Sequence, residues 1–210
     1  MTGDLQFEAA VHAFTWRGQP VPSVTQVLRD MGLASSWFKD DPMYRERGAA
    51  VHLACQYIDD GTFDESETHP ELLGYTKGYQ RFLADSGFVS QRSEVAAYSP
   101  GLKVAGITDK VGESNHRTWL LDLKSGKSAP KGVELQLGLY RLILGNGITM
   151  NGEEISMKFD AVKCLHLPGD NSYSLIDASD ARWMNYAQSA VGLWGLRKTW
   201  GLLNGRGQQQ

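Results

Sequence analysis

The spacing of apolar and polar residues divides the chain into a helical first part and a later part in which strands and helices alternate. Apolar residues at helical spacing predict helices at residues 24–31, 43–58 and 70–84. A short segment before them, residues 7–16, resembles a strand, and a turn follows at residues 17–19. The first part of the chain is therefore mainly helical.

The period changes after Gly87, where three successive strands are predicted at residues 88–98, 103–113 and 117–124. A helix, a strand hairpin and a last helix are predicted after them, at residues 131–144, 157–167 with 172–176, and 179–200. This order predicts the α/β class, with a small mixed β-sheet flanked by α-helices. We expect residues 1–204 to form a single domain and residues 205–210 to be a disordered tail.

The composition, with 41% hydrophobic and 21% charged residues, is that of an ordinary globular protein. No apolar run reaches the length of about 18 residues that a transmembrane helix needs, and the N-terminus lacks the pattern of a signal or transit peptide. Two cysteines, Cys55 and Cys164, are too few for a disulfide framework, a structural zinc site or an iron–sulfur cluster. We therefore expect a cytoplasmic protein with two reduced thiols.

The net charge of −3 argues against a protein that coats nucleic acid by bulk charge alone. Residues 101–150 nevertheless carry a net charge of +3, because they contain seven cations and four anions. The rest of the chain then carries a net charge of −6. The strand-rich middle is therefore the basic part of an acidic protein.

Asp122 and Lys124 end an apolar strand and point to the same face, because side chains alternate along a strand. Burying two charged groups is costly unless they are paired or bind an ion. If the turn at Asn115–His116 joins an antiparallel hairpin, Asp109 lies directly across from Asp122. The two Cβ atoms would then be about 5 Å apart.

Two carboxylates at that distance repel each other unless a divalent cation lies between them. Ligation by oxygen alone at few protein positions is typical of Mg²⁺ or Mn²⁺, which also take phosphate oxygens as ligands. A lysine beside the ion can orient or deprotonate an attacking water, or neutralise charge on a phosphate. Asp109, Asp122 and Lys124 are thus candidate catalytic residues, and a strand-end ion pair on a solvated edge is the structural alternative.

Four motifs in this order resemble the PD-(D/E)XK nuclease superfamily, and more narrowly its RecB-like branch. They are Gly48-Ala49-Ala50-Val51-His52, Gly106-x-x-Asp109, Asp122-x-Lys124 and Gln136-x-x-x-Tyr140. The segment Val21-Pro22-Ser23-Val24-Thr25 is similar to the opening of phage-encoded and mitochondrial-genome-maintenance-type exonucleases of this branch. The resemblance covers roughly residues 20–165.

The resemblance implies a restriction-endonuclease-like core and a site that uses Mg²⁺ or Mn²⁺ and no iron–sulfur cluster. It makes Asp109 and Asp122 both catalytic residues and metal ligands. The main-chain carbonyl of Leu123 and the side chain of His52 would be further ligands, and Lys124 would be the catalytic lysine.

Five other positions are expected to support the site or to contact DNA. Glu94 matches a less regular acidic position of the family and would support the site. Gln136 and Tyr140, four residues apart and so on one helix face, would contact the nucleic-acid strand. Arg47 and Lys127 are the basic candidates for nucleic-acid binding.

By this resemblance we expect a metal-dependent DNA exonuclease that acts in phage or bacterial recombination, repair or replication, in the cytoplasm of a bacterial host cell. Besides DNA, a single-strand annealing or single-strand binding protein is a candidate partner. The alternatives are an endonuclease of the same superfamily and a non-catalytic DNA-binding adaptor that retains the fold. A carboxylate pair that cleaves a glycosidic bond is conceivable, but it explains neither the lysine nor the basic segment.

Overall fold

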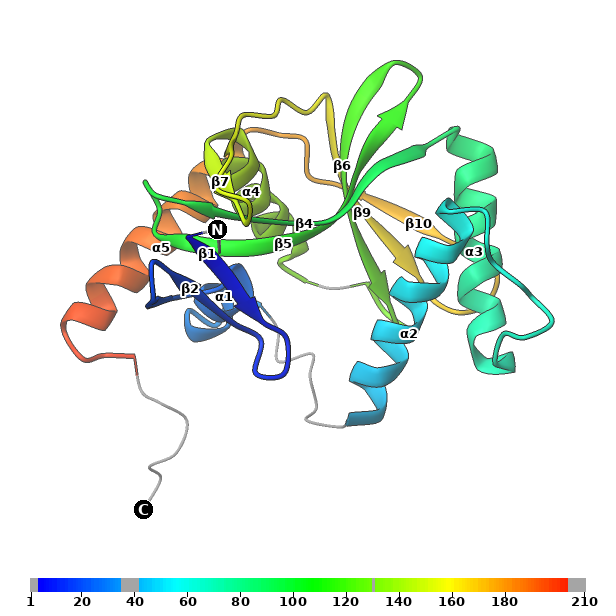
Figure 1. Cartoon of the computed structure of the whole chain (residues 1–210), viewed down its shortest axis with the longest axis horizontal. Coiled ribbons are helices and arrows are strands. Elements are labelled where there is room, and N and C mark those ends of the chain that lie inside the picture. The colour runs from blue at the N-terminus through cyan, green and yellow to red at the C-terminus, as the bar shows by residue number, and fades with distance from the viewer. Residues whose placement is uncertain (1–3, 35–41, 130, 204–210) are drawn as a thin grey trace.

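The computed structural model describes residues 4–34, 42–129 and 131–203 (Figure 1). Its main β-sheet has the strand order β10-β9-β6-β5-β4-β7-β8. In chain order the strands are β4 (Val89–Ser99), β5 (Val104–Ser114), β6 (Arg117–Ser125), β7 (Gly147–Thr149), β8 (Glu154–Ile155), β9 (Ala161–Leu167) and β10 (Ser174–Asp177). Within the described ranges, no helix is both long enough and apolar enough to cross a membrane. The predicted tail, residues 205–210, lies outside the described residues.

The main sheet is mixed. β6 and β9 run parallel, whereas the other neighbouring strands pair antiparallel. Parallel neighbours need a crossover connection, usually a helix, and here α4 (Val133–Gly145) lies in that connection. The predicted α/β class with a mixed, helix-flanked sheet is therefore confirmed. The sheet has seven strands, whereas five strands were predicted between residues 88 and 176.

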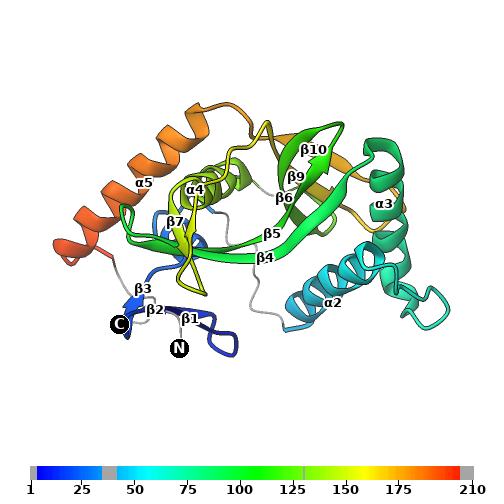
Figure 2. The same ribbon diagram turned by 45° about the horizontal axis from the view of Figure 1, so that its top comes forward.

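Helices cover the sheet on both faces, as Figure 2 shows. One apolar core unites the sheet with α1 (Val24–Asp30), α4 and α5 (Arg182–Thr199), and a second unites it with α2 (Pro42–Asp59) and α3 (Pro70–Ser86). Successive residues of β6 enter different cores, since Leu120 packs into the first and Leu121 into the second. The strand is buried on both sides, which explains its continuous apolar run.

The prediction of one strand over residues 7–16 is wrong. These residues belong to a separate three-stranded sheet of β1 (Leu5–Glu8), β2 (Ala13–Trp16) and β3 (Gln19–Val21). Residues 9–12 are an exposed turn, and His12 has a left-handed backbone with φ of 50°. Phe7 and Phe14 meet across the hairpin with ring centroids 4.7 Å apart. The turn itself contains the apolar residues Ala9, Ala10 and Val11, so the apolar pattern continues through it and resembled a single strand.

The region after α4 also differs from its prediction. Residues 147–149 and 154–155 form β7 and β8, where only a helix-ending glycine segment was expected. β9 begins at Ala161, so residues 157–160 are not part of a strand. Asp160 instead accepts a hydrogen bond from the N–H of Thr118 at 2.9 Å. β7 pairs with β4 and Asp160 with Thr118, which are distant in the chain, and local patterns do not encode such partners.

Close packing of α4 against the start of α5 gives a stability prediction. A Cβ at Gly138 would lie 2.5 Å from the carbonyl oxygen of Trp183, which is backbone and cannot rotate away. Gly138→Ala should therefore lower the free energy of unfolding by about 1–3 kcal/mol through overpacking. Gly192→Ala on α5, where no atom lies within 4 Å, should raise it by about 0.5–1 kcal/mol through helix propensity. Urea unfolding measures both, and an equal shift in the two variants would contradict the packing argument.

Candidate active site

Three acidic residues form one row across neighbouring strands. β5 and β6 pair from Ser114–Arg117 to Lys110–Leu121, which is the register that the predicted turn at residues 115–116 implies. One step beyond the last of these pairs, Asp109 on β5 comes opposite Asp122 on β6. On the other side of β5, the strand pairs with β4. The pairs Ser93–Lys110 and Val95–Thr108 come directly before and after Glu94, so Glu94 of β4 lies opposite Asp109. Glu94, Asp109 and Asp122 thus lie side by side in the order of their strands.

The sheet is irregular at this row. Val104 and Val111 both pack into the core with α4, although an odd number of positions separates them on β5. Regular alternation would place them on opposite faces, so the strand reverses its facing once between them. Glu94, opposite Asp109, has a left-handed backbone with φ of 51°, which is uncommon for a residue other than glycine. The irregularity therefore coincides with the acidic row.

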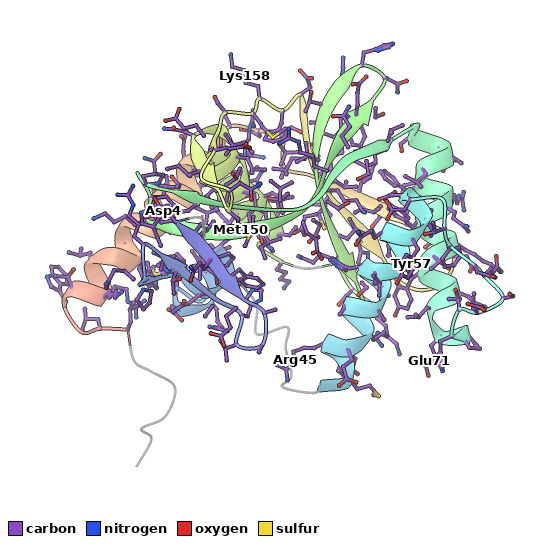
Figure 3. All side chains as sticks on the ribbon, in the orientation of Figure 1. Asp4, Arg45, Tyr57, Glu71, Met150 and Lys158 are labelled. Carbon is purple, nitrogen blue, oxygen red and sulfur yellow. The ribbon has the colours of Figure 1, made fainter. Side chains whose placement is uncertain are left out.

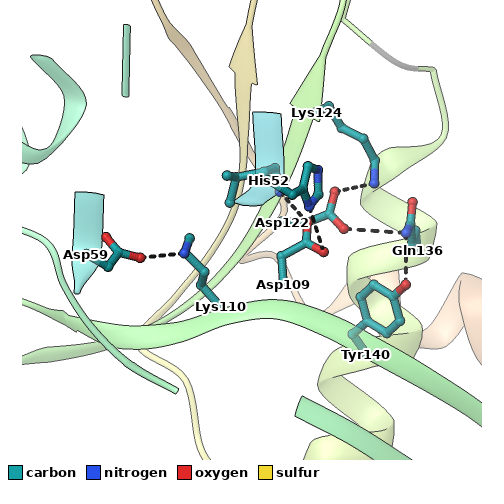
Figure 4. A network of polar contacts seen from close by, with 9 residues as sticks. His52, Asp59, Asp109, Lys110, Asp122, Lys124, Gln136 and Tyr140 are labelled. Atoms are coloured by element: carbon teal, nitrogen blue, oxygen red, sulfur yellow. Dashed lines mark hydrogen bonds and ion pairs between the residues drawn. The ribbon is translucent and has the colours of Figure 1, made fainter. Parts of the chain in front are cut away.

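The Asp109 carboxylate replaces a backbone acceptor where the pairing of β5 with β6 ends. Its Oδ2 accepts a hydrogen bond of 2.6 Å from the N–H of Leu123, beyond the end of the regular β5–β6 ladder. Its Oδ1 lies 3.7 Å from Nδ1 of His52, which is on α2. One side chain thus joins β5, β6 and α2, as Figure 4 shows.

Asp122 is the most deeply buried charged group of the row, with 1% of its side chain exposed. Nζ of Lys124 lies 2.7 Å from its Oδ2, and Nε2 of Gln136 donates to its Oδ1 at 3.4 Å. Oδ2 nevertheless accepts no hydrogen bond of ordinary geometry. Burial raises the pKa of Asp122 to about 6, against the opposing effect of the Lys124 charge, and the Asp109 charge raises it further. When both are ionised, Asp122 and Asp109 therefore carry more negative charge than Lys124 alone offsets.

Lys124 is partly open to solvent, with 30% of its side chain exposed. Burial of its ammonium would lower its pKa, but the charges of Asp122 and Asp109 outweigh this effect and raise the pKa above its usual value. The side chain is therefore protonated at neutral pH. In this state it suits the neutralisation of phosphate charge better than the deprotonation of a water.

Gln136 and Tyr140 reach the row from α4. Nε2 of Gln136 donates to the Tyr140 hydroxyl at 3.0 Å, so the two residues act as one unit beside Asp122. A Cβ at Gly106 would lie 2.7 Å from Cε1 of Tyr140. The first residue of the Gly106-x-x-Asp109 motif is thus a glycine because the tyrosine ring packs directly against β5.

The remaining predicted residues lie at different distances from the row. Glu94 lines a small cavity together with His52 and Asp109. The guanidinium carbon of Arg47 lies 4.9 Å from the Tyr44 ring centroid and 5.8 Å from that of Tyr75, and its buried Nε has no hydrogen-bond partner. Lys127 is exposed in the loop between β6 and α4. The structure brings His52, Glu94, Asp109, Asp122, Lys124, Gln136 and Tyr140 together, with Arg47 and Lys127 outside this group.

The donor set determines which metal ion fits. Within the described residues, no group of three or more His, Cys, Asp and Glu side chains is placed to hold a metal ion. Mg²⁺ commonly uses only one or two carboxylates and completes its shell with water and substrate phosphates. The buried Asp122 Oδ2, which lacks a hydrogen bond, together with the neighbouring Asp109, fits an ion of that kind. Ligation by His52 and by the Leu123 carbonyl stays a prediction.

Two charged residues beside the site escaped the sequence analysis. Lys110 counted there among the cations of the basic middle, but it is buried and pairs with Asp59 at the end of α2, with 4% and 9% of the side chains exposed. Lys110 therefore adds no charge to the surface. The available signal was its place in an apolar strand, directly after Asp109, where a second charge needs a partner.

Comparisons with known proteins give distant structural likenesses. No family model and no curated protein matches the chain. An alkaline exonuclease from Laribacter hongkongensis is 13% identical, with a TM-score of 0.43 over 86% of this chain and 88% of that one. In complex with dAMP, the same enzyme is 14% identical, with a TM-score of 0.38 over 88% and 95% of the two chains. A protein named SSO0001 is 11% identical, with a TM-score of 0.33 over 69% and 73%. At these values the likenesses establish no shared activity, and function has to be argued from the site itself.

The raised pKa of Asp122 predicts a pH dependence for the metal-free protein. A carboxyl whose pKa is about 6 when folded, against 3.8 as its ordinary value, stabilises the fold below about pH 4 and loses that contribution as pH rises through 6. Between these values the free energy of unfolding of wild type should fall by about 1–3 kcal/mol relative to Asp122→Asn. Urea titrations at several pH values measure this difference, and parallel pH profiles would refute it.

Proposed function

We propose that the chain is a divalent-metal-dependent deoxyribonuclease of the PD-(D/E)XK superfamily, in its RecB-like branch, and that it acts as an exonuclease. The observation that carries this proposal is the pair of neighbouring carboxylates, the buried Asp122 and Asp109, beside a protonated and partly exposed Lys124. Two ionised carboxylates carry more negative charge than one lysine offsets, and a divalent cation would compensate the remainder.

The residues of the site have distinct roles in this reaction. Asp109 and Asp122 would hold Mg²⁺ or Mn²⁺, with the Leu123 carbonyl and His52 as further ligands. When bound, the ion activates water and stabilises charge on the phosphate. The Lys124 ammonium lies 2.7 Å from Asp122 and is partly exposed, so it can reach a phosphate oxygen and neutralise the charge that develops as water attacks and the P–O bond breaks. Glu94 would support the site from β4.

Substrate contacts are assigned to groups around this centre. The Gln136–Tyr140 unit would contact the nucleic-acid strand beside the scissile phosphate. Arg47 has a buried Nε without a hydrogen bond, on the helix that also carries His52, so its guanidinium would meet a neighbouring phosphate. The exposed Lys127 would add a further phosphate contact. A role in phage or bacterial recombination, repair or replication, with a single-strand annealing or binding protein as partner, stays a prediction.

Loss of the central charges tests the proposed chemistry. Asp122→Ala and Lys124→Ala should each lower the rate of Mg²⁺-dependent nucleotide release from labelled DNA by on the order of 100-fold or more. Lys158→Ala is a matched control, because Lys158 is exposed in the segment before β9 and lies far from α2 (Figure 3), and it should keep the wild-type rate. Undiminished cleavage by both site variants would refute the assignment.

Substrate topology separates the three candidate functions. An exonuclease should degrade linear DNA and leave a covalently closed circle intact, because it needs a strand end. An endonuclease of the same superfamily would nick or linearise the circle, and a non-catalytic adaptor would bind DNA equally with and without metal and cleave neither substrate. Gel analysis of both DNA forms with and without Mg²⁺ decides among them, and cleavage of the circle would overturn the exonuclease proposal.

A further inference from the structure

A second charged cluster lies on the other side of β5 from the Asp122 carboxylate. Lys110 and Asp59 form an ion pair whose side chains are only 4% and 9% exposed. The Tyr79 hydroxyl donates a hydrogen bond of 2.7 Å to Asp59, and the Lys110 ammonium lies 5.6 Å from the centroid of the Tyr79 ring. The cluster therefore joins α2, α3 and β5 through polar contacts inside an apolar core.

Stability alone does not explain this arrangement. Taking two ions out of water costs free energy that a buried pair often fails to recover, so apolar residues of similar volume would serve the core as well or better. Asp59 is also the last residue of α2, where the negative end of the helix dipole disfavours an anion. Buried ionic groups that are not needed for stability can instead fix which elements meet, and in which register.

The geometry connects this pair to the acidic row. Lys110 directly follows Asp109 on β5, and both residues line the same small cavity with His52. Asp59 follows His52 by seven residues on α2, which is two turns, so the two side chains leave the helix in nearly the same direction, about 10 Å apart along its axis. β5 therefore holds α2 at two points, Asp109 with His52 and Lys110 with Asp59, as Figure 4 shows.

We propose that the Lys110–Asp59 pair is a positioning element that fixes the rotation and height of α2 on the sheet and thereby holds His52 against Asp109. Its consequence for metal binding and cleavage rests on the proposed nuclease function, whereas its effect on the position of α2 does not. Neither residue touches the phosphate. The pair acts through His52, whose Nδ1 lies 3.7 Å from Oδ1 of Asp109. Val51 and Cys55 also hold this part of α2, by apolar packing in the core.

The test replaces the whole polar cluster, so that no buried group loses its partner. Asp59→Leu/Lys110→Met/Tyr79→Phe should fold with a melting temperature equal to or above wild type. Its crystal structure should show His52 Nδ1 and Asp109 Oδ1 farther apart than 3.7 Å, by about 1 Å or more.

Affinity of the same variant for Mn²⁺, measured by calorimetry, should fall about 10- to 100-fold, the usual effect of losing support for metal ligands. kcat should fall in the same range while KM for DNA stays within about twofold, since DNA contacts are untouched.

A second variant and a control complete the test. Asp59→Glu keeps the charge and the hydrogen bond but lengthens the link, so it should fold and shift the same measurements in the same direction even if the triple variant does not fold. Glu65→Gln/Lys77→Gln removes an exposed pair of 3.0 Å near the same helices and should change none of them. A folded variant that keeps the His52–Asp109 separation and the Mn²⁺ affinity would overturn the positioning role. If wild type itself neither binds Mn²⁺ nor cleaves DNA, the proposed function fails, and the crystallographic separation still decides the role of the pair.

Discussion

The strand ladders are interrupted where ionised side chains lie at the centre of the β-sheet, and the candidate site is built around this interruption. At the row of Glu94, Asp109 and Asp122, β5 leaves regular pairing with both neighbours. The Asp109 carboxylate accepts the N–H of Leu123, so that no backbone donor is lost where the ladder ends. The same reversal of facing lets two successive residues, Asp109 and Lys110, both reach α2, at His52 and at Asp59.

Two charge systems of different character result on either side of β5. The pair of Lys110 and Asp59 is closed, because both side chains are nearly inaccessible and satisfied by each other and by Tyr79. The system of Asp122 and Lys124 is open, because the lysine that pairs with the buried carboxylate reaches solvent, with 30% of its side chain exposed. The closed system is satisfied within the protein, whereas the open one is accessible to solvent. This difference agrees with the proposed function, in which the open system would meet the metal ion and the phosphate.

Local pattern predicted the parts of the molecule that depend on neighbours in sequence. The turn at Asn115–His116 sufficed to predict the β5–β6 register, because hairpin register follows from the turn. α1 also begins where local pattern places it, at Val24, and the side chain of Ser23 caps it by accepting a hydrogen bond of 3.0 Å from the N–H of Gln26. The motif spacing likewise predicted which residues of β5, β6 and α4 gather, although their chemical roles stay predictions.

Features that depend on distant partners were not predictable. Lys110 and Asp59 are 51 positions apart, and the sequence around either residue does not indicate that the other is its partner. The reversal of facing on β5 leaves no trace in hydrophobic periodicity, because the strand is apolar on both sides. β7 and β8 have only three and two residues, too few for a pattern. β7 pairs with the distant strand β4, and β8 then pairs with β7 and forms the edge of the sheet.

The parallel pairing of β6 with β9 has a consequence for the choice of metal. It places Cys164 directly beside Asp122, so a sulfur atom neighbours a centre of carboxylate oxygens. Burial, reinforced by the negative charge of Asp122, raises the pKa of this thiol well above its usual value. Soft metals such as zinc bind the thiolate rather than the thiol. A cysteine that stays protonated therefore fills space beside the carboxylates without offering a thiolate, which agrees with the hard cation of the proposed function.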